Sequence, residues 1–328
     1  MAKRSSRILT PKTVLGRYYW VDEVKMPRKF AYVYSKVENV DPKFWMGVTK
    51  HELTKWFERN EGLVTRHVSH YYRPVKIPKR KGGFRELNIP NDELKEVQHA
   101  WLEYLNIVTR PFTSLSSYAF EKHRSVIDAL KVHSGNYFFL KCDIKDAFPS
   151  VRSSELLNKL RHSWHIAPNI THLIIEDCYF KGLPQGAPTS GKLFNMYLVG
   201  ADTLLPRAFS RMDGKYTRYA DDIVVSFPIN HKFSARRTLN LIQRYLNQMR
   251  LSLNLNKTRI FKGKAKILGC IIHEDGKITL SRKKRRLFRA MIHNSKTGKR
   301  SLSKHELNGI KGWLHMIYEN DSIPGVEF

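Results

Sequence analysis

The sequence predicts an α+β fold, because candidate strands fill the middle of the chain and amphipathic helices close it. Two stretches indicate the strands. Tyr137 to Asp143 is a short, mostly apolar segment that ends on a carboxylate, and Tyr216 to Phe227 divides into two strands around Asp221 and Asp222. Both stretches therefore place acidic side chains where strands end.

A hairpin precedes these strands and a helix lies between them. From Arg73 to Gln98, apolar and basic residues alternate around Gly82 and Gly83, which predicts a hairpin with a cationic tip. Ser190 can cap a helix. The apolar positions of that helix fall on one face, and they are Leu193, Phe194, Tyr197, Leu198, Ala201 and Leu204.

Two amphipathic helices are predicted near the end of the chain. The first follows Ser281 and carries a basic run from Arg282 to Arg286, with an apolar stripe of Leu287, Phe288, Met291 and Ile292. The second begins with the capping-box residues Ser303 and Glu306, and its apolar positions are Leu307, Ile310, Leu314 and Ile317. We expect the two stripes to pack against each other.

The charge of the chain indicates the class of its partner. Its 328 residues are 41% hydrophobic, which is enough for a sizeable core. They contain 58 Lys+Arg against 29 Asp+Glu, a formal net charge of +29. Such an excess requires a polyanion, and since no long apolar segment is present, nucleic acid is favoured over a membrane.

The cysteines exclude two classes of structure. Cys142, Cys178 and Cys270 lie far apart, without Cys-x-x-Cys spacing. Neither a disulfide framework nor a zinc ribbon is therefore indicated, and a reducing compartment is expected.

The strand-end carboxylates predict a metal site. Phosphoryl transfer to a nucleotide uses two divalent cations about 3.5–4 Å apart. Magnesium takes few protein oxygens besides waters and phosphates, so two or three aspartates suffice. Asp143 and the pair Asp221 and Asp222 lie far apart in the sequence, and only a folded sheet can unite them. An isolated Asp-Asp pair is more often a solvated turn.

Four ordered blocks resemble those of reverse transcriptases. Residues 218–222 read Arg-Tyr-Ala-Asp-Asp and are similar to the catalytic box of that family. Residues 141–150 resemble its first catalytic block, residues 182–190 its template and nucleotide-positioning block, and residues 254–259 the block that follows the catalytic hairpin. The resemblance implies an RNA-directed DNA polymerase with a right-hand fold of fingers, palm and a small helical thumb.

The same resemblance implies a division of the chain. Residues 1–72 form an N-terminal basic arm, residues 73–135 the fingers, residues 136–272 the palm with the catalytic site, and residues 273–328 the helical thumb. The arm could also pass for a transit segment, but its proline and aromatic residues break the amphipathic pattern, and a nucleic-acid-binding arm is preferred.

The resemblance also assigns catalytic roles. Asp143 and Asp221 are the expected ligands of two Mg²⁺ ions, for which Mn²⁺ is a possible substitute. Asp222 tunes the site or ligates in one state. Lys257 corresponds to a lysine held near the pyrophosphate, where its ammonium can protonate the leaving group, although a solvated lysine is the competing interpretation.

Five further residues are expected to bind the incoming deoxynucleotide. Phe148 stands where the family places a bulky side chain against the sugar, so that a ribose 2′-hydroxyl would clash. Gln185 and Gly186 match the loop that packs on the nucleotide. Lys79 and Arg85 match the cationic hairpin that grips the triphosphate, and for Lys79 a plain phosphate-backbone contact is nearly as plausible.

Among reverse transcriptases, the sequence most resembles the retron type. Residues 118–133 are similar to the insertion before the first catalytic block, which closes on His133, although Ala129 and Leu130 depart from it. Residues 307–318 resemble the compact retron thumb. The retron type implies a structured noncoding RNA as template and primer, a branched RNA–DNA product, dNTPs as substrates, an effector protein, antiphage defence and the bacterial cytoplasm.

Nucleic acid is expected to contact His133 and the thumb cations Arg282, Lys283, Arg285 and Arg286. Three alternatives stay open within the family, namely an abortive-infection or other defence-associated enzyme, a diversity-generating element and an intron maturase. A different class is a basic RNA-binding protein with a vestigial polymerase site. The intact set of Asp143, Asp221, Asp222, Gln185 and Lys257 argues against that last reading.

Overall fold

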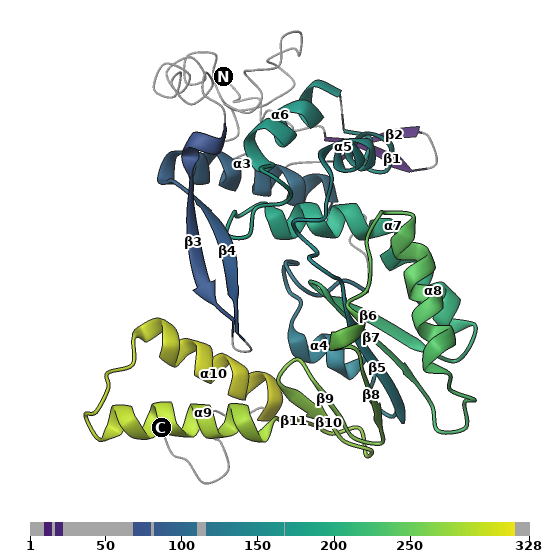
Figure 1. Cartoon of the computed structure of the whole chain (residues 1–328), viewed down its shortest axis with the longest axis vertical. Helices are drawn as coiled ribbons and strands as arrows, with labels where there is room; N and C mark the ends of the chain where they lie inside the picture. Colours follow the sequence, from purple (N-terminus) through teal and green to yellow (C-terminus); the bar gives the residue numbers. More distant parts are fainter. Residues whose placement is uncertain are drawn as a thin grey trace, which may run out of the picture. The chain divides into compact units, whose positions relative to one another are not determined.

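The structure, a computed structural model, describes residues 10–14, 17–21, 68–79, 82–109, 116–166 and 168–318. The chain divides into two units, each assembled from separate segments. Figure 1 labels helices and strands of both units. The first unit comprises Met1–Thr113, Asp146–Gly200 and Met249–Leu251, and the second comprises Ser114–Lys145, Ala201–Gln248 and Ser252–Phe328. The predicted arm, residues 1–72, lies mostly outside the described residues, and the fourfold division into arm, fingers, palm and thumb stays a prediction.

The first unit contains two antiparallel hairpins and several helices. Strand β1 (Thr10–Val14) pairs with β2 (Arg17–Val21), and β3 (Tyr72–Pro78) pairs with β4 (Phe84–Pro90). The β3–β4 hairpin confirms the one predicted around Gly82 and Gly83, which adopt φ values of +92° and +75° that glycine tolerates. The helices of this unit are η3 (Val68–Tyr71), α3 (Asp92–Thr109), α5 (Ser153–His162), α6 (Pro168–Cys178) and the first part of α7 (Ser190–Ser210).

Buried polar contacts join the elements of the first unit. The Trp101 indole on α3 donates to the Asp177 carboxylate on α6 at 2.8 Å. Gln98 Nε2 donates both to Tyr72 Oη at 2.7 Å and to the Asp177 carbonyl at 2.8 Å. The Tyr72 ring stacks on Phe180, with 5.3 Å between the ring centroids. These contacts fix the base of the β3–β4 hairpin against α3 and the end of α6.

The second unit is built on a four-stranded antiparallel sheet in the order β6-β7-β5-β8. Its strands are β5 (Phe138–Asp143), β6 (Lys215–Tyr219), β7 (Asp222–Phe227) and β8 (Arg259–Lys262). The predicted strands on both sides of Asp221 and before Asp143 are therefore confirmed. The register sets Asp143 directly across from Asp222.

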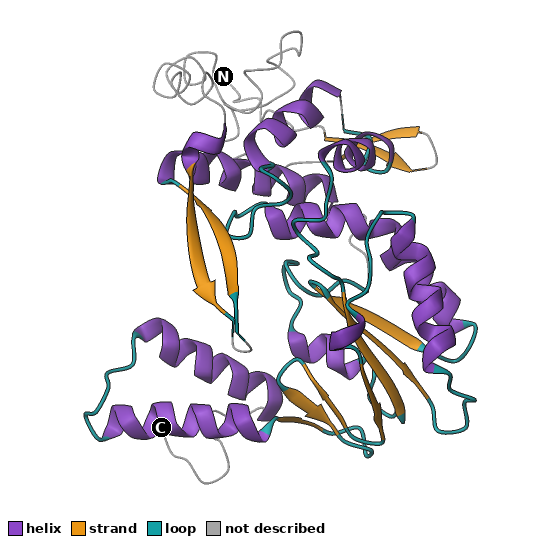
Figure 2. Ribbon diagram, viewed as in Figure 1, coloured by secondary structure: helices purple, strands orange, loops and turns teal. Residues whose placement is uncertain are grey.

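The described part of the same unit also contains a smaller sheet, the second part of α7 and several further helices. The smaller sheet has the order β11-β10-β9, with β9 (Ala265–Ile267), β10 (Cys270–Ile272) and β11 (Ile278–Leu280). The helices are α4 (Val126–Lys131), α8 (Ala235–Asn247), α9 (Arg282–Lys296) and α10 (Lys304–Tyr318), with a short turn of helix, η5 (Leu255–Lys257). Figure 2 shows this mixture of helices and antiparallel sheets, which confirms the α+β class.

One apolar cluster holds α4, α9 and α10 against both sheets of the second unit. The four-stranded sheet contributes Phe139 and Val224, and the buried apolar side of α9 contributes Phe288 and Ile292. The other members are Ile127, Leu130, Ala265, Ile267, Cys270, Ile272, Leu280, Ile310 and Leu314. The two C-terminal helices therefore share a core with the sheet that carries the carboxylates.

The capping box of Ser303 and Glu306 was predicted correctly, but the cap at Ser190 and two apolar positions were not. Ser190 is the first residue of α7, and its Oγ donates to the Pro184 carbonyl at 2.7 Å. Ser281 Oγ accepts from Lys284 N, and Ser303 and Glu306 form the reciprocal capping box. Leu287 is 54% exposed and Leu204 is 42% exposed, which corrects their assignment to the buried stripes. In each case the next residue, Phe288 or Leu205, is buried instead. Successive residues of a helix point about 100° apart, so the residue next to a buried one can point away from the core.

Cys142, Cys178 and Cys270 are free and buried, as expected from their spacing. No helix among the described residues combines the length and apolarity that crossing a membrane requires.

Candidate active site

Three carboxylates meet at one end of the four-stranded sheet. Asp143 is the last residue of β5, Asp222 is the first residue of β7, and the two are paired across the strands. Asp221 lies in the turn between β6 and β7, and its carbonyl accepts from the Ile144 amide at 2.9 Å. We call these three residues the acidic cluster. The sheet unites them, as the separation in sequence required, while their role stays a prediction.

Two lysines of the second unit neutralise part of the acidic cluster. Lys257 Nζ lies 2.8 and 3.0 Å from the two Asp143 oxygens, and Lys141 Nζ lies 2.9 Å from Asp222 Oδ1. The η5 turn that carries Lys257 is tied to β5, because Asn254 N donates to the Asp143 carbonyl at 2.7 Å. Lys257 therefore lies beside Asp143, its expected role at the pyrophosphate stays a prediction, and Lys141 is an addition.

Sequence reasoning missed Lys141, although a signal for it was present. Successive side chains of a strand alternate between its two faces, so a lysine two residues before Asp143 shares the face of that carboxylate. The register then brings Lys141 level with Val224, two residues after Asp222 on the neighbouring strand. The period-two pattern of β5 would have been enough to place a cation beside the cluster.

The electrostatics of the acidic cluster reflect its crowding. Burial raises the pKa of Asp221, and the neighbouring carboxylates of Asp143 and Asp222 raise it further. Burial also raises the pKa of Asp222, against the opposing effect of Lys141. The hydrogen bond to Asp143 raises the pKa of Lys257, which keeps its ammonium protonated at neutral pH. The three carboxylates therefore repel one another, and a bound cation would reduce this repulsion.

The donor set of the acidic cluster suits a hard divalent cation. Its three side chains offer only carboxylate oxygens, which magnesium and manganese accept. The three aspartates lie at one end of the sheet, but among the described residues no three His, Cys, Asp or Glu side chains are grouped closely enough to hold a metal ion. Lysine ammonium groups hold Asp143 and Asp222 in their present positions. The chemistry of the cluster fits the two predicted ions, and these ions remain a proposal.

In the first unit, the loop with Gln185 and Gly186 is tied to β4. The Gln185 carbonyl accepts from Asn88 N at 2.9 Å. Gly186 has a φ of +119°, and a Cβ there would lie 3.2 Å from the Asn88 carbonyl oxygen. Only glycine therefore fits without strain, and the loop lies against the hairpin that carries Lys79 and Arg85.

The other predicted nucleotide-binding residues also belong to the first unit. Phe148 is half-buried, its ring stacks on Phe194 at 4.8 Å, and its carbonyl accepts from Leu183 N at 3.0 Å. Lys79 and Arg85 are exposed on the hairpin. The structure thus gathers these residues in one unit and the acidic cluster in the other.

The structure corrects the prediction that His133 binds nucleic acid. His133 is completely buried, and its two ring nitrogens lie 2.7 Å from Ser226 Oγ and 2.8 Å from Thr217 Oγ1. Burial lowers the pKa of His133 to about 3, so the ring is neutral. A resemblance in sequence does not report burial, and this histidine is a core residue that joins α4 to β6 and β7.

The basic face of α9 is accessible. Arg282, Lys283 and Arg286 are exposed, and Arg285 is half-buried. Their binding to nucleic acid stays a prediction.

A comparison with known families decides the identity of the chain. The family model described as reverse transcriptase (RNA-dependent DNA polymerase) matches residues 77–272, a stretch that contains the acidic cluster and the Gln185–Gly186 loop. The chain belongs to the reverse transcriptase family. It is therefore an RNA-directed DNA polymerase, in agreement with the blocks read from the sequence.

Curated relatives narrow the type of this reverse transcriptase. The chain is 32% identical over 256 residues to retron Ec86 reverse transcriptase of Escherichia coli, covering 76% of this chain and 77% of the relative. It is 30% identical over 306 residues to retron Mx162 reverse transcriptase of Myxococcus xanthus, covering 84% and 62%. These relatives support the retron type.

Solved structures of telomerase show some likeness in fold. Apo telomerase from Candida tropicalis is 13% identical, covers 70% of this chain and 52% of its own, and has a TM-score of 0.49. A likeness of this size does not bear on function.

Proposed function

We propose that this reverse transcriptase joins deoxynucleotides by two-metal nucleotidyl transfer at the acidic cluster. The observation that carries the proposal is the pairing of Asp143 with Asp222 across β5 and β7, with Asp221 in the adjoining turn. This arrangement concentrates carboxylate oxygens at the end of a rigid sheet, where they are held by main-chain hydrogen bonds.

Each residue of the acidic cluster, and Lys257 beside it, has its own role in this proposal. Asp143 and Asp221 hold the metals, and Asp222 tunes the site or ligates in one state. Two Mg²⁺ ions, or Mn²⁺ in their place, supply activation of the primer hydroxyl and stabilisation of the leaving pyrophosphate. Lys257, protonated beside Asp143, donates a proton to the leaving group.

In the first unit, we assign the incoming nucleotide to Phe148, the Gln185–Gly186 loop and the β3–β4 hairpin. The Phe148 ring excludes a ribose 2′-hydroxyl, and its contact with Phe194 supports that role by restricting the ring. Exposed Lys79 and Arg85 supply cations for the triphosphate, and Arg85 offers a bidentate donor pair.

The retron type of the relatives supports a further part of the proposal. The template and primer are a structured noncoding RNA, the product is branched RNA–DNA, and the enzyme acts with an effector protein in antiphage defence in the bacterial cytoplasm. Sequencing of the nucleic acid that copurifies with the chain tests this part. Recovery of DNA covalently joined to one RNA species is expected, and recovery of unrelated cellular RNA alone would contradict it.

The catalytic proposal is tested by replacing Asp221 and Asp222 together with Asn. Incorporation of labelled deoxynucleotides should be abolished, because the metals lose their ligands, while filter binding of RNA should stay within about twofold, because the basic surface is unchanged. Asp213→Asn is the matched control, since Asp213 is an exposed aspartate of the same unit. Full incorporation by the double variant would end the catalytic assignment.

A further inference from the structure

The turn that carries Asp221 has an unusual backbone. Tyr219 and Asp222 are the last paired residues of β6 and β7, so that Ala220 and Asp221 form a two-residue loop. Ala220 adopts a φ of +55°, in the left-handed region that favours glycine. A residue with a Cβ persists there only if its surroundings hold it.

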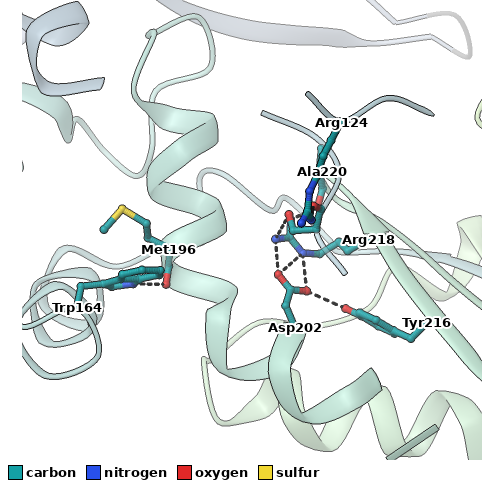
Figure 3. Close-up of polar contacts among 8 residues, drawn as sticks. Arg124, Trp164, Met196, Asp202, Tyr216, Arg218 and Ala220 are labelled. Carbon is teal, nitrogen blue, oxygen red and sulfur yellow. Dashed lines mark hydrogen bonds and ion pairs between the residues drawn. The ribbon is translucent and has the colours of Figure 1, made fainter. Parts of the chain in front are cut away.

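Arg218, on the preceding strand β6, makes the contact that holds Ala220 in this conformation. Its Nη1 donates to the Ala220 carbonyl at 2.7 Å, and Nη2 donates to Ser117 Oγ at 2.9 Å. Its Nε lies 3.0 and 3.1 Å from the two oxygens of Asp202, and Oδ2 of that carboxylate also accepts from Nη2. Tyr216 Oη donates to the same carboxylate at 3.1 Å (Figure 3). Asp202 and Ser117 therefore hold Nε and Nη2 of the guanidinium, and Nη1 reaches the turn.

The main chain of Arg218 is fixed as well. Its amide donates to the Ser116 carbonyl at 2.7 Å, and its carbonyl accepts from Tyr118 N at 2.9 Å. Both side chains of the Arg218–Asp202 pair are only 1% exposed, so no water competes for these contacts. The donor to Ala220 thus comes from a rigid, buried support.

Stability alone does not account for this arrangement. A buried ion pair can usually be replaced by apolar residues of similar size without loss of stability, because desolvation offsets the attraction between the charges. The contact that such a replacement cannot supply is the one from Nη1 to Ala220. That carbonyl belongs to the peptide that enters Asp221, and the peptide that leaves Asp221 is bound through its carbonyl to Ile144 N, next to Asp143.

We propose that Arg218 is a positioning residue of the polymerase, which holds the Ala220–Asp221 peptide and so fixes the place of Asp221 beside Asp143. The proposal rests on the catalytic role proposed above for the acidic cluster. Arg218 touches no reacting atom and acts through the backbone of Asp221. Displacements of about 1 Å in such positioning can cost roughly 100-fold in rate.

The test compares three variants of the full chain. The apolar variant combines Arg218→Met, Asp202→Leu and Tyr216→Phe. It removes both charges of the ion pair, the tyrosine hydroxyl that bonds to Asp202, and the hydrogen bond to the Ala220 carbonyl. Tyr216→Phe alone is the control, since it removes one hydrogen bond to Asp202 and leaves the contact with Ala220. Arg218→Lys is the third, because one ammonium cannot reach Asp202, Ser117 and Ala220 from the positions of the guanidinium nitrogens.

The measurements are the melting temperature, the rate of deoxynucleotide incorporation and the affinity for Mn²⁺ without nucleotide, read by electron paramagnetic resonance. We expect the apolar variant to remain folded, to lose about 10- to 100-fold in rate with little change in the KM for nucleotide, and to bind Mn²⁺ at least about threefold more weakly. Arg218→Lys should show the same pattern. Tyr216→Phe should keep the Mn²⁺ affinity of the wild type.

Ala220→Gly, added to Arg218→Lys, provides a rescue that a merely structural role does not predict. Glycine adopts the positive φ without support, so part of the lost rate and Mn²⁺ affinity should return. A folded apolar variant with wild-type rate and Mn²⁺ affinity would overturn the inference about Arg218. Should that variant fail to fold, an unaltered Mn²⁺ affinity of Arg218→Lys would overturn it equally.

An Asp221→Asn variant in the same assays separates the two proposals. If Asp221→Asn keeps full incorporation, the catalytic assignment itself is overturned, and the positioning role with it. If Asp221→Asn is inactive while the Arg218 variants match the wild type, only the positioning role is overturned.

Discussion

At the scale of single residues, the acidic cluster combines three carboxylates with two lysines. The aspartates were predictable from the sequence, because Asp143 and Asp222 stand at the ends of strands whose apolar pattern is local and Asp221 directly precedes Asp222. Lys141 was accessible to the same reasoning, whereas the burial of His133 and the contact of Arg218 with Ala220 depend on segments far apart in the sequence. Local patterns predict which residues share a face of a strand, but they do not predict which residues from distant segments contact them in the folded chain.

If Asp222 takes part in metal binding as proposed, Lys141 competes with the metal for it, and removal of Lys141 should tighten metal binding. Their charged atoms lie 2.9 Å apart, and both side chains are about three-quarters buried. Lys141→Met keeps the length of the side chain and removes the positive charge, which repels a dication by at least about 1 kcal/mol at 4 Å. We expect Mn²⁺ to bind roughly 3- to 10-fold more tightly, measured by electron paramagnetic resonance without nucleotide.

The control for Lys141 is Lys264→Met. Lys264 is an exposed lysine of the same unit, and it follows β8 at the end of the sheet opposite to Asp143. Its removal should leave Mn²⁺ affinity within about twofold, because screening by salt weakens interactions beyond about 10 Å. Weaker Mn²⁺ binding by Lys141→Met would show that this lysine orients Asp222 instead of competing with the metal.

Phe148 should decide the choice of sugar. Phe148→Ala removes the ring that we assign to the 2′ position, and the ratio of ribonucleotide to deoxynucleotide incorporation should rise by about tenfold or more, because the excluded substrate no longer meets a clash. Phe180→Ala is the matched control, since this half-buried ring of the same unit also has a stacking partner, Tyr72. Equal use of both nucleotide types by the wild type would contradict the assignment.

At the scale of elements, the capping box of the last helix was predicted better than the buried faces of the helices. The capping box of Ser303 and Glu306 depends on four adjacent residues, so the sequence alone contains it. The buried side of α9 depends on where α10 and the smaller sheet lie, and the apolar stripe was therefore predicted one residue too wide. Phe288 enters the core of the second unit, while Leu287 faces outward.

This difference gives a paired prediction for α9. Phe288→Ala should lower the free energy of unfolding by roughly 3–5 kcal/mol, because it empties a site in the core. Leu287→Ala should change it by no more than about 0.5 kcal/mol, since the side chain is 54% exposed. Thermal and denaturant unfolding of both variants measure the two values. Similar losses in the two variants would mean that α9 packs through a different face.

At the scale of the whole molecule, the net charge of +29 predicted a polyanionic partner, and membership of a family that copies RNA agrees with it. A total charge does not say where the polyanion lies. The exposed cations are spread over several elements, among them the β3–β4 hairpin, α8 and α9. Tracing the path of the RNA therefore requires variants that change the position of the lost charge and keep its amount constant.

Two fourfold variants meet that requirement. In the first, Arg282, Lys283, Arg285 and Arg286 of α9 are replaced by Gln. In the second, the exposed residues Lys232, Arg236, Arg237 and Arg244, in and just before α8, are replaced by Gln. Each lowers the formal net charge from +29 by four, to +25. If RNA follows α9, only the first variant loses phosphate contacts.

The measured quantity is the slope of the logarithm of RNA affinity against the logarithm of salt concentration. Each lost phosphate contact flattens this slope by roughly 0.7–0.9, so four contacts on α9 should flatten it by about 3, while the α8 variant should change it by less than about 1. Both variants should unfold within about 0.5 kcal/mol of the wild type, because all the replaced side chains except the half-buried Arg285 are exposed. Equal slopes in the two variants would show that net charge alone drives binding, and an unchanged slope in the α9 variant would move the RNA path to the β3–β4 hairpin around Lys79 and Arg85.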